Sequence, residues 1–221
     1  MSLDPSPLHG YFISGSDTGV GKTWVACQLI ERWRKQGKNI RVRKPVESGC
    51  ERDPAGNLLP ADGLALARAA GNIDALDSVT PYRFEAALAP DRAAMLAHAS
   101  LTIQDLAQAV RAGLTDDDFV IVEGAGGICS PLTRDGLNAD LARCLQLPLI
   151  LVIEDRLGAI NQALMAIRAA DAESLRVAAV ILNHRSEISE PHMDNLADLG
   201  ARLQIPVYRC PLAAAMPDTP L

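Results

Sequence analysis

The 221-residue sequence is 48% hydrophobic and 22% charged, which is typical of a globular protein with one sizeable core. A formal net charge of -6, with no run of lysine or arginine, argues against binding to nucleic acid. We expect one domain over residues 1–221 with a flexible N-terminus at residues 1–10, no membrane span and, because the five cysteines show no paired spacing, a cytoplasmic location.

The segment GSDTGVGKT at residues 15–23 follows a short apolar run at residues 11–14 and precedes an amphipathic pattern. A strand, a glycine-rich turn and a helix in this order predict a phosphate-binding loop. Lys22 would reach the outer phosphates of a nucleotide, and the Thr23 hydroxyl would help to bind Mg²⁺. Five residues rather than four separate the outer glycines, so a strand-to-helix turn with a chance GKT is the structural alternative.

Two kinds of apolar spacing alternate along the rest of the chain. Continuous apolar runs predict strands buried on both faces, and apolar residues at helical spacing predict the helices between them. This alternation predicts an α/β fold of the doubly wound, P-loop NTPase type: a mainly parallel sheet with helices on both faces. Strands are expected at residues 11–14, 39–43, 119–123, 147–153, 177–182 and 206–210, helices at about 24–36, 64–71, 102–112, 159–170 and 191–203, and irregular segments at 46–60 and 81–90.

Four polar residues outside the phosphate loop are candidates for chemistry. Lys44, Glu123 and Asn183 follow predicted strands, where ligands bind in such sheets. Glu123 is interpreted as a metal ligand rather than a solvated strand end, and Lys44 as a phosphate-side or a surface lysine with equal weight. Asn183 would cap a turn or contact adenine. Asp62 precedes a helical run, so its simplest interpretation is an N-cap.

Four segments in order carry a resemblance to a known family: GSDTGVGKT, KPVESG at residues 44–49, VEGAGG at 122–127 followed by Pro131-Leu132, and LGAINQ at 157–162. Together they resemble the dethiobiotin synthetases. The resemblance implies that ATP and Mg²⁺ support ring closure of 7,8-diaminopelargonate with carbon dioxide, through a carbamate and a carbamic-phosphoric anhydride. It also implies a homodimer with active sites at the subunit interface.

The resemblance also implies roles for individual residues. Lys22 and Lys44 would be catalytic, and Thr23, Asp62 and Glu123 would bind the metal. ATP contacts would come from Gly19, Val20, Gly21, Lys22, Thr23, Asp62, Glu123, Asn183, Pro211 and Leu212. Substrate contacts would come from Thr18, Lys44, Ser48 and Gly126 and, across the dimer, from Gly158, Ala159, Ile160 and Asn161.

Three positions depart from the family pattern in regions that the resemblance assigns to the substrate pocket and the nucleotide base: Gln162, Asp91 and His184. Two other functions remain open. A nucleotide switch of the partitioning-ATPase type would have a lysine early in the phosphate loop, where this chain has Ser16. A small-molecule kinase would have an arginine-rich lid, whereas Arg52 is the only arginine of residues 46–60.

Overall fold

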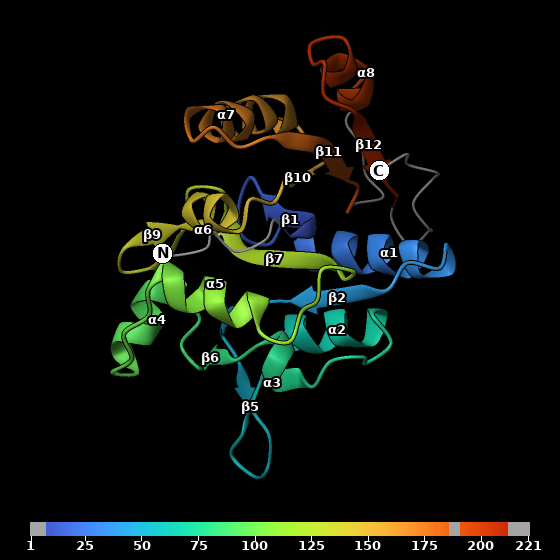
Figure 1. The fold of residues 1–221 in the computed structure, drawn as a ribbon. Helices are drawn as coiled ribbons and strands as arrows, with labels where there is room; N and C mark the ends of the chain where they lie inside the picture. Colours follow the sequence, from blue (N-terminus) through green and yellow to red (C-terminus); the bar gives the residue numbers. More distant parts are fainter. Residues whose placement is uncertain (1–7, 186–190, 212–221) are drawn as a thin grey trace, which may run out of the picture.

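A computed structural model describes residues 8–185 and 191–211. Six strands of this part of the chain form one sheet in the order β12-β11-β10-β1-β7-β2, and every neighbouring pair is parallel. The predicted parallel α/β fold is therefore confirmed (Figure 1). The strands are β1 (His9–Gly15), β2 (Ile40–Arg43), β7 (Phe119–Gly127), β10 (Leu149–Glu154), β11 (Val177–Asn183) and β12 (Val207–Cys210).

Successive side chains of each strand point to opposite faces of the sheet, and the apolar ones form a separate core on each face. Phe12 and Leu151 belong to the core under α5, α6 and α7, whereas Ile13 and Val152 belong to the core under α1 and α2. The helices are α1 (Lys22–Lys35), α2 (Ala61–Ala69), α3 (Leu76–Val79), α4 (Pro90–Leu96), α5 (Ile103–Arg111), α6 (Asn138–Leu145), α7 (Ala159–Ala172) and α8 (Asn195–Gly200). Within the described ranges, none of these helices has the length and apolar character needed to span a membrane.

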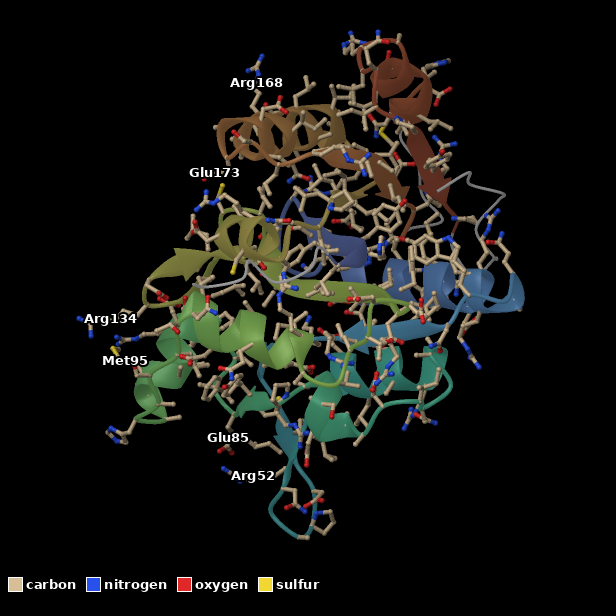
Figure 2. All side chains as sticks on the ribbon, in the orientation of Figure 1. Arg52, Glu85, Met95, Arg134, Arg168 and Glu173 are labelled. Carbon is tan, nitrogen blue, oxygen red and sulfur yellow. The ribbon has the colours of Figure 1, made fainter. Side chains whose placement is uncertain are left out.

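Residues 46–60 are not the long loop that their glycines and prolines predict. They form β3 (Val46–Ser48) and a projecting antiparallel hairpin of β4 (Glu51–Arg52) and β5 (Leu58–Leu59) (Figure 1). The Asp53 carboxylate accepts hydrogen bonds from the backbone N–H groups of Ala55 and Asn57, so residues 53–57 form the turn of this hairpin. Figure 2 shows Arg52 and Glu85 close together at this end of the molecule, where they form an exposed ion pair of 2.8 Å.

Residues 81–90 are not irregular throughout, as their prolines predict: they include β6 (Tyr82–Phe84), which pairs in parallel with β3, and the Phe84 side chain is buried. Pro90 begins α4, since proline is tolerated in the first turn of a helix. The sequence pattern did not reveal α3, α6 or the short hairpin of β8 (Pro131–Thr133) and β9 (Gly136–Leu137). Strand β1 starts at His9, so residues 9 and 10 do not belong to a flexible end.

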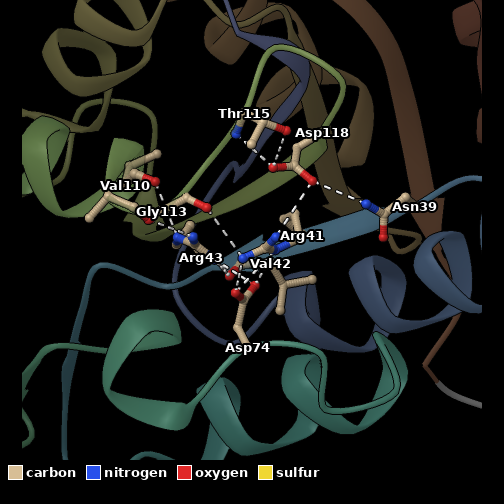
Figure 3. A network of polar contacts seen from close by, with 10 residues as sticks. Asn39, Arg41, Val42, Arg43, Asp74, Val110, Gly113, Thr115 and Asp118 are labelled. Atoms are coloured by element: carbon tan, nitrogen blue, oxygen red, sulfur yellow. Dashed lines mark hydrogen bonds and ion pairs between the residues drawn. The ribbon is translucent and has the colours of Figure 1, made fainter.

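A buried ionic network stabilises the outer strand β2 (Figure 3). Arg43 is almost fully buried, and its guanidinium donates to Asp74 at 2.8 Å and to the carbonyls of Val42, Val110 and Ala112. Asp74 also accepts from Arg41 Nε at 3.0 Å. Every charged group of this network has a partner, which is the arrangement that makes a buried ion pair tolerable.

Candidate active site

The phosphate loop connects β1 at the centre of the sheet to α1. Gly19 and Gly21 have φ angles of 77° and 87°, which residues with a Cβ atom rarely adopt. A Cβ atom on Gly21 would also lie 2.1 Å from Nδ2 of Asn183. The loop therefore requires glycine at position 21 both for its backbone angle and for its contact with β11. The free N–H groups of the first turn of α1 follow directly, as anion binding requires.

A cavity of about 610 Å³ opens beside this loop at the carboxyl ends of the strands. This is the position at which doubly wound sheets bind their ligands. The residues that line it are Thr18, Gly19, Gly21, Lys22, Thr23, Lys44, Glu47, Ser48, Asp62, Ala87, Leu88, Ala89, Pro90, Ala125, Gly126, Ser130 and Pro131.

Lys22 begins α1 and is buried within this cavity. Its Nζ atom donates to the carbonyl of Asp17 at 3.0 Å. Burial, with a smaller contribution from the charge of Lys44, lowers the pKa of Lys22 to about 8. An anion bound in the cavity would favour the charged form of this lysine.

Thr23 of α1, Asp62 of α2 and Glu123 of β7 lie together with Lys44, which directly follows β2. Lys44 Nζ donates to Glu123 Oε1 at 2.6 Å and to Asp62 Oδ2 at 2.8 Å, and Thr23 Oγ1 donates to the same Glu123 oxygen at 2.9 Å. Burial by itself lowers the pKa of Lys44, but the charges of Glu123 and Asp62 outweigh it and raise that pKa. Lys44 therefore carries a fixed positive charge inside the cavity.

The structure corrects the interpretation of Asp62 as an N-cap. Helix α2 begins one residue earlier, and the position before its first residue is occupied by Pro60, whose side chain cannot accept a hydrogen bond. The Asp62 side chain points instead to Lys44. Burial raises the pKa of this carboxyl, but the charge and hydrogen bond of Lys44 prevail and lower it.

The expected substrate residues Thr18, Ser48 and Gly126 line the same cavity. Ser48 Oγ donates to the carbonyl of Leu88 at 2.6 Å, which ties β3 to the segment before α4. A Cβ atom on Gly126 would lie 2.5 Å from Ser130 Oγ and 3.5 Å from Thr18 Oγ1, so glycine leaves the space between these hydroxyls open.

The segment from Gly158 to Asn161 does not line this cavity. It forms the N-terminal end of α7, where Gly158 has a φ angle of 93°. Two large apolar side chains beside it are exposed, Leu157 at 74% and Met165 at 62%. One subunit therefore does not bring this segment together with Lys44.

Asn183 ends β11 and is buried against the phosphate loop, where its Nδ2 donates to the carbonyl of Val20 at 2.9 Å. Its Oδ1 atom is buried without a hydrogen-bond partner. Pro211 follows β12 but does not line the cavity, and Leu212 lies outside the described residues.

Sequence reasoning missed two residues that shape the cavity. Glu47 accepts the N–H groups of Asp62 and Gly63 at the start of α2. Asn138, the first residue of α6, donates to the carbonyls of Ala125 and Gly127 and accepts the N–H of Ala125, which fixes the end of β7. Glu47 lies inside the quoted KPVESG segment, but its backbone partners are distant in sequence. No local spacing marks Asn138.

Comparison with solved structures gives the fold. The signal recognition particle receptor FtsY of Elizabethkingia anophelis in complex with GDP matches with a TM-score of 0.55 at 17% identity, over 95% of this chain and 59% of that chain. A ParA family ATPase of Chlorobium tepidum matches with a TM-score of 0.51 at 15% identity, over 92% and 84% of the two chains. At these identities the matches support the P-loop NTPase fold alone.

Sequence comparison is more specific. A family model described as an AAA domain matches residues 9–212. The ATP-dependent dethiobiotin synthetase BioD of Vesicomyosocius okutanii is 43% identical over 176 residues, which cover 80% of this chain and 79% of that protein. The protein of the same name from Anaeromyxobacter dehalogenans is 37% identical over 207 residues, covering 93% and 89% of the two chains. The chain therefore belongs to the family of ATP-dependent dethiobiotin synthetases, which are ligase-type enzymes.

Proposed function

We propose that this enzyme converts 7,8-diaminopelargonate, carbon dioxide and ATP to dethiobiotin, ADP and phosphate. The observation that carries the proposal is the position of Lys44, which is buried between two carboxylates in the cavity that the phosphate loop lines. A carbamate and a triphosphate are both anions, so a reaction between them requires concentrated positive charge. Lys22, at the start of α1, and Lys44, directly after β2, both line the cavity and would supply this charge.

The chemistry proceeds in three bond-forming steps. One amine of the substrate attacks carbon dioxide and loses a proton, which gives a carbamate. A carbamate oxygen then attacks the γ-phosphorus of ATP, and the bond to the β,γ-bridging oxygen breaks to release ADP. The second amine finally attacks the carbamoyl carbon, which closes the ureido ring and expels phosphate together with the oxygen that the carbamate supplied.

The two lysines have different roles in this scheme. Lys44 stays protonated because its pKa is raised, so it acts as a positive charge beside the carbamate and the transferring phosphoryl group rather than as a base. Lys22 follows the phosphate loop and would contact the β- and γ-phosphates. Its lowered pKa makes its charge the one that responds to an incoming anion.

The residues around Lys44 fit a magnesium ion. Glu123 Oε2 is buried and has no hydrogen-bond partner, the Thr23 hydroxyl donates to the other Glu123 oxygen, and the Asp62 carboxylate accepts from Lys44. No group of three acidic, histidine or cysteine side chains in residues 8–185 and 191–211 could hold an ion alone. That suits Mg²⁺, which binds through one or two carboxylates, waters and substrate phosphates. When bound, the ion would neutralise charge on the triphosphate; Thr23, Asp62 and Glu123 are its proposed ligands.

The remaining ATP contacts are assigned by position. Backbone groups of Gly19, Val20 and Gly21 would surround the phosphates. The Asn183 Oδ1 atom is an acceptor without a donor, and the amino group of adenine is a donor of the kind that would satisfy it. Pro211 and Leu212 would flank the base.

The substrate site requires a second subunit in this proposal. Thr18, Ser48 and Gly126 would contact the diamine or carbamate in one subunit. The N-terminus of α7, with Gly158, Ala159, Ile160 and Asn161, would receive the substrate carboxylate from the partner, as helix N-termini receive anions. Exposure of Leu157 and Met165 beside this segment supports an interface there. We place the homodimer in the cytoplasm.

Phosphate release from ATP tests the proposed reaction. Release should require diaminopelargonate and bicarbonate together, and dethiobiotin should accumulate in equal amount. Hydrolysis of ATP without the diamine would indicate a nucleotide switch, and a stable phosphorylated diamine would indicate a kinase. Either result would refute the proposed function.

The shared site is tested by mixing variants. Lys44→Ala and Asn161→Ala should each be nearly inactive, because each removes one half of both sites in a two-fold dimer. After subunit exchange, random mixing should restore about a quarter of all sites, since half the dimers are mixed and each has one intact site. As a control, a variant that carries both Lys44→Ala and Asn161→Ala should stay inactive after the same exchange procedure. Confirmed exchange without recovered activity would refute the shared-site arrangement.

A further inference from the structure

We propose that Glu47 is a positioning residue that aims Asp62 at Lys44. This inference rests on the proposed function of Lys44 and Asp62 and adds a residue to which no role has been assigned. Glu47 lies at the centre of β3 and is buried with an exposed fraction of 6%. A buried carboxylate in a short outlying strand is costly unless its oxygens have partners.

Both oxygens of Glu47 have partners, and both partners belong to the first turn of α2. Oε1 accepts the N–H of Asp62 at 3.0 Å, and Oε2 accepts the N–H of Gly63 at 2.9 Å. These are the groups that an N-cap side chain normally satisfies. Pro60 occupies the N-cap position and its side chain has no acceptor, so a residue of β3 caps this helix.

This cap fixes the residue that contacts the catalytic lysine. The backbone N–H of Asp62 is held by Glu47 while its side chain accepts from Lys44 Nζ at 2.8 Å. Glu47 is itself only three residues from Lys44, and both line the cavity. The helix start, the Asp62 carboxylate and the lysine are therefore connected through one buried side chain. Burial raises the pKa of Glu47, and the two N–H donors act against this shift by favouring its charged form.

Amide hydrogen exchange tests the geometry without any ligand. In Glu47→Ala, which removes both acceptor oxygens, the exchange of the Asp62 and Gly63 amides should become about tenfold faster or more. Glu47→Gln keeps one neutral acceptor oxygen, so the exchange of at least one of the two amides should become faster. Unchanged exchange at both amides in Glu47→Gln and Glu47→Ala would overturn the proposal.

Turnover tests the consequence. Glu47→Ala should lower kcat by about 10²-fold, as small displacements of catalytic groups do, with unchanged affinity for ATP in the absence of Mg²⁺ because Glu47 does not contact the phosphate loop. Glu47→Asp should recover part of this loss. In an Asp62→Ala background, the further substitution of Glu47 should have no additional effect on kcat. Equal losses in both backgrounds would assign Glu47 a general structural role and overturn the proposal.

The matched control is Asp105→Asn. Asp105 completes the capping box of α5, accepting the Thr102 N–H at 2.9 Å, and lies away from the cavity. This variant should unfold at a lower temperature but keep the wild-type kcat.

If wild-type turnover proves independent of diaminopelargonate, the proposed function fails, while the exchange experiment still decides the role of Glu47.

Discussion

Arg43 and Lys44 are adjacent, both are buried, and both contact carboxylates, yet their surroundings differ. The Arg43 guanidinium donates to Asp74 and to three backbone carbonyls, so the charged groups of this network are already paired with one another (Figure 3). Lys44 lies between Glu123 and Asp62 at the edge of a cavity, and one Glu123 oxygen has no partner. The fully paired Arg43 network stabilises β2, whereas the Lys44 network keeps an unpaired acceptor beside a cavity, where a ligand could bind it.

Among these substitutions, Asp74→Ala should have the largest effect, and the property affected is the stability of the fold. Removing Asp74 leaves the buried Arg43 charge without its acid partner, so the free energy of unfolding should fall by about 3–5 kcal/mol. The kcat per folded molecule should not change. Urea denaturation measures the free energy of unfolding, and activity normalised to folded protein measures kcat. A loss of kcat in fully folded Asp74→Ala would show that the Arg43 network also serves turnover.

Lys44→Gln should show the opposite pattern. Turnover should fall by about 10²–10³-fold, because one preorganised charge is removed from the site of transfer. ATP should still bind, since Lys44 does not contact the phosphate loop in the described structure. Exposed Lys35, at the end of α1, offers the matched charge removal: Lys35→Gln should keep full turnover. Wild-type kcat in Lys44→Gln would remove the lysine from the mechanism.

Thr23→Ala should have an intermediate effect. It removes the hydroxyl that donates to Glu123, so turnover at limiting Mg²⁺ should fall by about tenfold while stability changes by about 1 kcal/mol. Thr23→Ser keeps the hydroxyl and should restore turnover. Activity that falls only in proportion to lost folded protein would contradict the metal-site assignment.

The smallest effect concerns pH. The pKa of Lys22 is lowered to about 8, so the free enzyme loses this charge as the pH rises through that value. The kcat/KM for ATP, which reports the free enzyme, should therefore decline above pH 8. Lys22→Arg should shift the decline to higher pH, because arginine stays protonated. The same decline in Lys22→Arg would assign the titration to another group.

The parallel strands and the phosphate loop could be predicted because their signals are local: continuous apolar runs and glycines before GKT. The hairpin of β4 and β5 could not, because a turn closed by Asp53 has the same composition as an open loop. Helix α6 is short and was likewise missed.

The candidate site was predicted unevenly for the same reason. Lys44 could be found because it directly follows β2, and Glu123 because it ends a continuous apolar run, although β7 extends beyond it to Gly127. Glu47 could not, because its role depends on the N–H groups of a helix that begins fourteen residues later in the chain, at Ala61. Asp62 resembled a cap in sequence, and only the structure places its side chain on Lys44.

The proposed attack of a carbamate oxygen on ATP is tested most directly by the fate of that oxygen. The enzyme would be given ¹⁸O-labelled bicarbonate with diaminopelargonate and ATP, in a reaction short enough to limit exchange with water. The released phosphate should carry one ¹⁸O atom per dethiobiotin formed, as seen by mass spectrometry. Phosphate whose new oxygen comes from water instead would contradict the account.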